Sequence, residues 1–534
     1  MITKGRFLGS ALVVFCIFLL GSIATAQVQP LTPESESSIG ENVTEALDTK
    51  LAAEDESNES PEEGVRFAPA SVDSSPFMVL NAEPMKTAVR FQGSAYEMGY
   101  QHGYLLAEQV RSTCDDDFIR TILLSYLGSD QTLSGLLHNN VVFGAILSVL
   151  QTKAMTQSIF ATADMRREMR GIAAGAIKRL EELNLDPGRI SYERLVLVNL
   201  GFDVILAYAY PLLVNKYLSE EQREAVDASR IERRMHMCDG FIATAGATST
   251  GGTIMGRSFM FSDIVGRNAM IMDYSPSNGN RFVAVNIPGF VGTPAAMNEH
   301  GLSIGMDMVP ALRTNFVAPG MGCLLTARYV MQYTDSATSA SFAIRNSYAR
   351  GVPWIYIVGD PQGGVVVEAG ATSWPGWWPS QQKFFAVRPL DYVFDPAKNP
   401  EPGIDQIETR NDLVVASNHF IDPSLRAAAK SRAVEDSMGR YDYLTGKVLE
   451  AAESGIDVEV AKRLINYLSP EADNPYGDDL ISNPDGDGGV LISDYYKGSV
   501  YVQSIRAVFD MDTRMMHALY GLWTDPWVSY SLAP

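Results

Sequence analysis

The feature that most constrains this chain is an abrupt change of pattern at Cys238. Before it, residues 77–237 carry apolar side chains mainly at helical spacing. After it, residues 239–245 and 253–259 alternate loosely as strands around a Gly-Gly turn, which predicts a β-hairpin. Cysteine is scarce in this chain, so one that begins a strand directly behind a helical segment needs a specific explanation.

Short strands and two further groups of helices are expected between the hairpin and the C-terminus. The expected strands are residues 270–274, 281–287, 293–297, 302–309, 354–358, 364–368, 383–387, 412–416, 490–493 and 500–509. The expected helices are residues 326–349, 436–450 and 458–468. Because most connections are short, most strand pairing should be antiparallel. This order of elements predicts an α+β fold.

Four segments are expected along the 534 residues. Residues 1–26 combine basic residues, an apolar run and a small-residue cleavage site, as a secretory signal does. The run is short for a spanning helix, although an uncleaved N-terminal anchor stays open. Residues 27–75 are acidic and almost free of aromatic side chains, which predicts a disordered tether. Residues 76–237 would form a helical front chain and residues 238–534 the catalytic chain of a secreted or periplasmic protein.

The net charge of the chain argues against two classes of partner, and its cysteine count limits how many disulfides it can form. A formal net charge of −21 argues against nucleic acid or an anionic membrane surface as the main partner. Cys16 would leave with the signal, so Cys114, Cys238 and Cys323 remain. An odd number means that at least one thiol lies outside any disulfide within the chain. Three buried structural thiols are the plain alternative to a nucleophile.

The layout around Cys238 resembles that of an N-terminal nucleophile (Ntn) hydrolase. In that mechanism the thiol attacks the carbonyl of Met237, and an N-to-S acyl shift releases a new N-terminus. The α-amino group then serves as the base, since its pKa of about 7.7–8.0 lies close to the thiol value of about 8.5. No histidine is needed near the nucleophile.

Ordered motifs carry a resemblance to a known family. They are GSAYEMGYQHGYLLAEQV (residues 93–110), CDGFIATAGATSTGG, MGRSFMF, AAMNEHGLSIGMDMV, LVVASNHFIDP and DSMGRYDYL. Together they resemble the isopenicillin N acyltransferase (acyl-CoA:6-aminopenicillanic acid acyltransferase) family and, more distantly, choloylglycine hydrolases and acid ceramidase. The resemblance implies an αββα sandwich of two antiparallel sheets between helical layers, with no cofactor.

The same resemblance implies roles for five residues. Cys238 matches the nucleophile and Arg257 the arginine beside it. Asn418 matches the asparagine that helps to form the oxyanion hole, and Asn298 is a candidate oxyanion or substrate donor. Arg440 matches the arginine of the Ser-x-x-Arg-Tyr segment. The alternative is that both arginines are ordinary ion-pair residues and both asparagines are turn residues.

One departure affects the expected chemistry. The family usually has an aspartate three residues after the motif arginine, where it helps to hold the new α-amino group, and here that residue is Met260. Asp239 and Asp263 are the candidate replacements. We also expect a disulfide between Cys114 and Cys323, because it would leave Cys238 available to the mechanism.

The sequence therefore predicts an exported, autoproteolytic cysteine hydrolase or acyltransferase. It would act on an amide bond of a small N-acyl or lipid-like substrate through a Cys238 thioester and retain its front chain after cleavage. We expect no metal, although residues 483–494 partly resemble a calcium loop. The oligomeric state stays open. The alternatives are a non-catalytic binding protein on the same fold and a phospholipase B-like lipid esterase.

Overall fold

The computed structural model describes residues 77–79, 87–127, 137–209, 238–259, 263–309, 311, 314, 320–346, 350–371, 384–390, 410–429, 435–466, 505–520 and 525–533. Five features named above lie outside these residues: the signal-like segment 1–26, the acidic segment 27–75, Met237, Met260 and the loop 483–494. No described helix is both long enough and apolar enough to cross a membrane.

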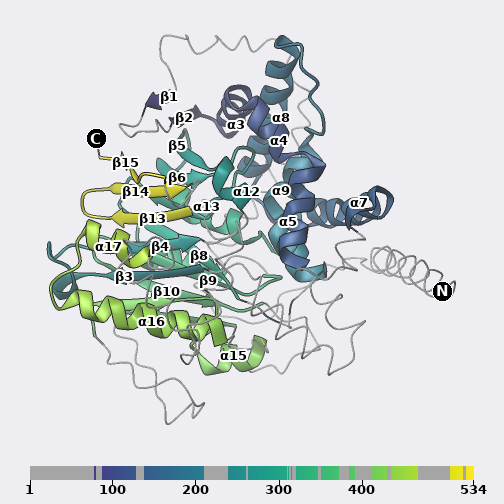
Figure 1. The fold of residues 1–534 in the computed structure, drawn as a ribbon. Helices are drawn as coiled ribbons and strands as arrows, with labels where there is room; N and C mark the ends of the chain where they lie inside the picture. The colour runs from purple at the N-terminus through teal and green to yellow at the C-terminus, as the bar shows by residue number, and fades with distance from the viewer. Residues whose placement is uncertain are drawn as a thin grey trace, which may run out of the picture.

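Two sheets form the centre of the molecule (Figure 1). In spatial order, the nine-stranded sheet comprises β1 (Phe77–Val79), β2 (Thr87–Gly93), β5 (Met270–Pro276), β6 (Phe282–Asn286), β7 (Ala295–Asn298), β8 (Ser303–Met308), β9 (Trp354–Asp360), β10 (Gly363–Ala369) and β11 (Phe385–Pro389). The six-stranded sheet comprises β12 (Leu413–Ala416), β3 (Cys238–Ala243), β4 (Ile254–Phe259), β13 (Ile505–Asp510), β14 (Met515–Tyr520) and β15 (Val528–Ser531). The expected hairpin is present as β3 and β4, which pair antiparallel.

Helices cover the outer face of each sheet, while the inner faces pack on each other. Helices α16 (Glu435–Ala452) and α17 (Val458–Ile465) lie on β12, β3, β4 and β13, whereas α13 (Cys323–Tyr333) and α14 (Ala337–Asn346) lie on β7, β8, β9 and β10. Strands β3 and β4 face β8, and β3 also faces β9 and β10 (Figure 1). The predicted αββα architecture is confirmed. The single helix expected over 326–349 is two helices.

The front of the chain is helical apart from the strands β1 and β2. Its helices are α3 (Ala95–Leu105), α4 (Ala107–Thr113), α5 (Asp116–Leu127), α7 (Asn140–Gln157), α8 (Ala163–Glu182) and α9 (Tyr192–Val204), which continues into the π-helix η2 (Ile205–Ala209). Strand β2 pairs in parallel with β5 and so joins the front segment to the nine-stranded sheet. Every other pair of neighbouring strands is antiparallel. The sequence did not predict this parallel strand.

The glycines of the first motif serve the packing of α3 against α8. A Cβ at Gly99 would lie 2.1 Å from the carbonyl oxygen of Glu168, and one at Gly103 would lie 2.0 Å from that of Ile172. Ser94 begins α3 with a capping box, in which its side chain accepts from the Glu97 nitrogen. The motif therefore fixes how the front segment packs and supplies no chemical group.

Candidate functional site

Cys238 lies fully buried at the start of β3, with two other residues around its backbone. Its nitrogen donates a hydrogen bond of 2.7 Å to Oδ1 of Asn418. Nη2 of Arg440 donates to the same oxygen at 2.9 Å, and Nη1 of Arg440 donates to the carbonyl oxygen of Cys238 at 3.3 Å. Three of the five residues matched by the resemblance therefore meet at the backbone of the expected nucleophile.

Strand register explains why Asn418 reaches Cys238. Strand β12 pairs antiparallel with β3, with Ala416 opposite Gly240. The residues just beyond the end of β12 consequently run alongside the first residues of β3. Arg440 comes from α16, which packs on both strands. The segment with Asn418 and the helix with Arg440 thus converge on one end of β3.

Arg257 lies on β4, directly opposite Gly240 of β3. Its guanidinium donates to the carbonyl oxygens of Asp239, Ser258 and Met306, so it spans the two sheets. Gly305 of β8 makes room for this arginine, since a Cβ there would lie 2.4 Å from Cδ of Arg257. Arg257 therefore lies in the same buried region as Cys238. Its closest contacts are with β8 and with the neighbours of Cys238, not with Cys238 itself.

The sequence reading missed Asp307, a fully buried carboxylate on β8. Its Oδ1 lies 2.9 Å from Nη1 of Arg257, and neither oxygen has a hydrogen-bond partner among the described residues. Burial raises the pKa of Asp307 to about 6, and the nearby charge of Arg257 opposes that shift. Its signal was present in the sequence as an acidic residue near the end of a strand that is otherwise apolar apart from Ser303.

Of the two candidate replacement carboxylates, Asp239 lies at the site. Its Oδ1 accepts from Nη1 of Arg440 and, at 2.7 Å, from Oγ of Ser417. Asp263 begins the helix α12 (Asp263–Asn268), and its side chain is not among those described. The structure thus contains two buried carboxylates near Cys238, Asp239 and Asp307, where the resemblance led us to expect one.

Asn298 does not contribute to this group, contrary to the prediction. Its Nδ2 donates to the carbonyl oxygens of Met331 and Thr334, at the end of α13. Its Oδ1 accepts from the nitrogens of His300 and Leu302 in the turn after β7. Both hydrogens of Nδ2 have acceptors, so Asn298 serves as a turn residue that also holds α13, and these contacts give no support to its predicted role as an oxyanion or substrate donor.

The predicted disulfide between Cys114 and Cys323 is also wrong. Both are buried free thiols that belong to different helices. Cys114 ends α4, and burial raises its pKa to about 12. Cys323 begins α13, where its nitrogen donates to Oδ2 of Asp203. Each thiol therefore has its own packing site, and free cysteine is commonly buried as a small apolar residue.

A buried ion pair holds the segment that carries Asn418. Glu368 of β10 accepts from Nε of Arg388 at 2.6 Å and from the nitrogens of Ile421 and Asp422. Arg388 of β11 also donates to the carbonyl oxygen of Val415. The nine-stranded sheet thereby binds the main chain before and after Asn418. These contacts hold the Asn418 amide in position beside Cys238.

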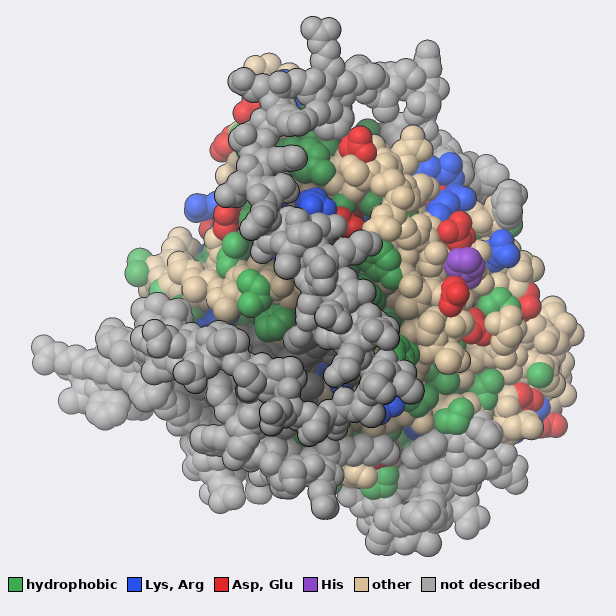
Figure 2. Space-filling model, turned by 180° about the vertical axis from the view of Figure 1, so that it is seen from behind, with side chains coloured by type: hydrophobic (Ala, Val, Ile, Leu, Met, Phe, Trp, Pro, Cys, Tyr) green, Lys and Arg blue, Asp and Glu red, His purple; other side chains and the backbone are tan. Residues whose placement is uncertain are grey.

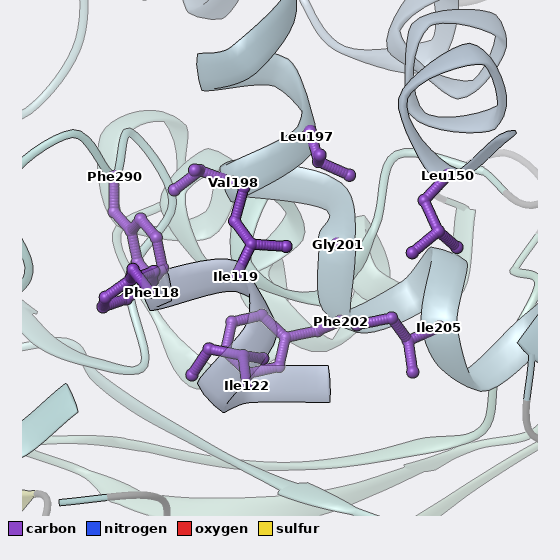
Figure 3. A pocket seen from close by; sticks show the side chains of 10 residues that line it. All are labelled: Phe118, Ile119, Ile122, Leu150, Leu197, Val198, Gly201, Phe202, Ile205 and Phe290. Atoms are coloured by element: carbon purple, nitrogen blue, oxygen red, sulfur yellow. The ribbon is translucent and has the colours of Figure 1, made fainter. Parts of the chain in front are cut away.

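An apolar pocket lies among the front helices (Figure 3). Its lining residues come from α5, α7, α9, η2 and the loop after β6: Phe118, Ile119, Ile122, Leu150, Leu197, Val198, Gly201, Phe202, Ile205 and Phe290. Its cavity volume is about 30 Å³, which is space on the scale of one or two water molecules. No lining side chain can supply acid, base or nucleophile, so this pocket could take only an apolar group.

Neither the charges on one face of the molecule nor a group of metal ligands among the described residues points to a second site. On the face seen in Figure 2, acidic and basic side chains of the described residues are interspersed and do not form a patch of one sign. No group of His, Cys, Asp or Glu among the described residues could hold a metal ion. The polar cluster at the start of β3 is therefore the candidate active site.

Comparisons with known proteins give one relative in sequence and several in structure. No family model matches the chain. A protein from Archaeoglobus fulgidus, described only as an uncharacterized protein, is 37% identical over 452 residues. That alignment covers 84% of this chain and 66% of the relative, so the chain spans just under two thirds of the relative's length.

Two of the similar solved structures are hydrolases by name. One is the N-acylethanolamine-hydrolyzing acid amidase ortholog of Caenorhabditis elegans, with 12% identity and a TM-score of 0.32 over 55% of this chain and all of that chain. Another is a mutant conjugated bile acid hydrolase from Clostridium perfringens, with 9% identity and a TM-score of 0.32 over 56% of this chain and 92% of that chain. Neither is an isopenicillin N acyltransferase, so that part of the resemblance stays a prediction.

Proposed function

We propose that the chain is an autoproteolytic cysteine N-terminal nucleophile hydrolase that cleaves an amide bond in an N-acyl substrate. The observation that carries this proposal is the 2.7 Å contact between the Cys238 nitrogen and Oδ1 of Asn418. In this mechanism that nitrogen is released by self-cleavage and then acts as the base. The adjacent charge of Arg440 favours the neutral amine, because a nearby positive charge disfavours the ammonium form.

Self-cleavage would proceed through a thioester. The Cys238 thiol adds to the carbonyl carbon of Met237, the carbon–nitrogen bond between the two residues breaks, and the nitrogen takes up the proton that the thiol loses. Water then hydrolyses the thioester, which leaves a carboxylate on Met237 and an amine and a thiol on Cys238. The front chain stays in place through the β2–β5 pairing.

Substrate turnover would reuse the same atoms. The α-amine takes the thiol proton, Sγ adds to the substrate carbonyl, and the amine then protonates the leaving nitrogen. Asn418 gives one hydrogen of Nδ2 to the carbonyl oxygen of Met308 at 2.8 Å. The second has no partner among the described residues, and it is the hydrogen that an oxyanion would accept. Water completes hydrolysis of the acyl-enzyme, whereas an amine in its place would give acyl transfer.

We take the apolar pocket of the front helices as a candidate place for an apolar acyl group, because its lining offers only aliphatic and aromatic side chains. The secretion-like N-terminus supports a site of action outside the cytosol, where acyl-CoA is scarce, and therefore favours hydrolysis over CoA-dependent transfer.

Edman sequencing of the mature protein tests the export signal. Matched amide and ester substrates with one acyl group separate the amidase from a lipid esterase.

The deciding experiment is a denaturing mass spectrum of the purified protein beside Cys238→Ala. We expect two fragments from the wild type, one beginning at Cys238, and one uncut chain from the variant. Cys323→Ala is the matched control and should be cut like the wild type. An intact wild-type chain would remove the α-amine as base, and the non-catalytic alternative would then replace this proposal.

A further inference from the structure

A row of hydrogen bonds leads from Asp239 away from the nucleophile to a buried histidine. Oγ of Ser417 lies 2.7 Å from Oδ1 of Asp239 and 3.1 Å from Oγ of Ser437. Oγ of Ser437 lies 2.7 Å from Nδ1 of His419. All four side chains are at most 1% exposed, so water does not compete for these bonds. The row connects the six-stranded sheet to α16.

Counting protons fixes the direction of this row. A serine hydroxyl has one hydrogen to donate, and an ionised carboxylate can only accept. Oδ1 of Asp239 is paired with the charged Arg440 and acts as an acceptor. Ser417 therefore donates its one hydrogen to Asp239. Ser437 must then donate to Ser417. His419 is left as the donor to Ser437, which places its proton on Nδ1.

The reverse direction would leave a contact without a hydrogen. If Ser437 donated to His419, the oxygens of Ser437 and Ser417 would face each other at 3.1 Å with only lone pairs between them. Burial and the charges of nearby arginines hold the pKa of His419 well below its usual range, so the ring is neutral and has a single proton. One tautomer therefore satisfies all three contacts.

We propose that His419, through Ser437 and Ser417, is a positioning residue that holds Asp239 and thereby sets Arg440 against Cys238. Arg440 is the group that touches both the carbonyl oxygen of Cys238 and the Asn418 amide beside its nitrogen. A row of donors with one direction gives Asp239 one fixed orientation. The link to catalysis rests on the proposed function, whereas the tautomer does not.

The tautomer is tested on the unmodified protein. In a sample labelled with ¹⁵N only at histidine, long-range proton–nitrogen spectra distinguish a protonated Nδ1 from a protonated Nε2. The His419 signals are assigned by their loss in His419→Asn. We expect the proton on Nδ1. A proton on Nε2 would overturn the directional row, whatever the protein catalyses.

The positioning role is tested by removing one hydrogen bond of the row at a residue that does not contact Cys238. Ser437→Ala should slow both self-cleavage and alkylation of Cys238 about tenfold, the value of one buried hydrogen bond near a charge. His419→Asn retains an N–H close to the position of Nδ1 and should recover most of the rate, whereas His419→Phe should not. Equal rates for Ser437→Ala and the wild type would overturn the positioning role.

The chain offers a matched control for these variants. His517 of β14 and Ser529 of β15 make the same Nδ1–Oγ contact at 2.7 Å, at residues paired in another part of the sheet. Ser529→Ala should leave self-cleavage and alkylation unchanged. If the wild type neither cuts itself nor reacts at Cys238, the proposed function fails, while the histidine spectrum still decides the row.

Discussion

Nη1 of Arg257 lies 2.9 Å from Oδ1 of Asp307, and neither side chain is exposed to solvent. The pair joins the two sheets, because Arg257 belongs to β4 and Asp307 to β8. The arginine was matched from the sequence, but its partner was not. An ion pair so deeply buried usually costs stability relative to an apolar pair, so we expect this pair to serve the proposed site and not the stability of the fold.

Asp307→Asn should therefore change the pH dependence of stability. The folded-state pKa of about 6 lies above the ordinary value of 3.8, so the folded state binds more protons than the unfolded state between these values. Wild-type stability should consequently fall as pH rises from 4 to above 6, by roughly 3 kcal/mol from this group. The variant should lack this fall. Urea unfolding of both proteins at pH 4, 5, 6 and 7 measures the difference.

The same variant should lose function while it keeps stability at neutral pH. Without the carboxylate, Arg257 has only carbonyl oxygens to hold it, so the rate of self-cleavage should fall. Asp117→Asn, which removes an exposed carboxylate of α5, is the control and should alter neither property. A pH profile of stability identical to the wild type would contradict the assigned titration of Asp307.

Asn199 is predicted to hold the front chain to the catalytic chain. Its Oδ1 accepts from the nitrogens of Val291 and Gly292, and its Nδ2 donates to the carbonyl oxygen of Gly289. Asn199→Ala leaves these buried groups unpaired and should destabilise the protein by about 2–4 kcal/mol. In size-exclusion chromatography of cut protein, the wild-type chains should elute together.

The Asn199→Ala chains should separate at lower urea than the wild type. Asn268→Ala is the control, because Asn268 bonds only within its own helix and should leave this urea concentration unchanged. Separation of the wild-type chains without denaturant would contradict retention of the front chain.

The sequence predicted what depends on local pattern and missed what depends on distant contacts. The hairpin at Cys238 follows from alternating side chains and a glycine turn, so it was found. The parallel pairing of β2 with β5 joins residues about 180 positions apart and has no local signal. Asn298 lies in a motif that resembles the family, but only its four hydrogen bonds show that its amide is already committed.

Replacing Gly201 by alanine should stabilise the folded protein. It lies in the middle of α9 and lines the apolar pocket, and a Cβ there would meet nothing within 4 Å. Gly201→Ala should raise the free energy of unfolding by about 1 kcal/mol, through helix propensity and partial filling of the pocket. Gly144→Ala in the exposed face of α7 is the control, because its Cβ also meets nothing and it gains propensity alone.

A smaller gain at Gly201 than at Gly144, measured by thermal unfolding, would show that the pocket has no room for a methyl group. If the pocket holds the acyl group, the bulkier Gly201→Leu should also lower turnover of long-chain more than short-chain substrates. Equal effects on both chain lengths would place the acyl group elsewhere.

The reactivity should differ sharply among Cys114, Cys238 and Cys323. Burial raises the pKa of Cys114 to about 12 and that of Cys323 well above the ordinary range, so neither forms an appreciable thiolate at pH 8. On the proposed mechanism, Cys238 of the cut protein would have its own α-amine as base. Iodoacetamide at pH 8, followed by peptide mass mapping, should label Cys238 at least a hundredfold faster than the other two. Equal labelling of all three in the folded protein, with faster labelling only after urea is added, would identify Cys238 as a third structural thiol.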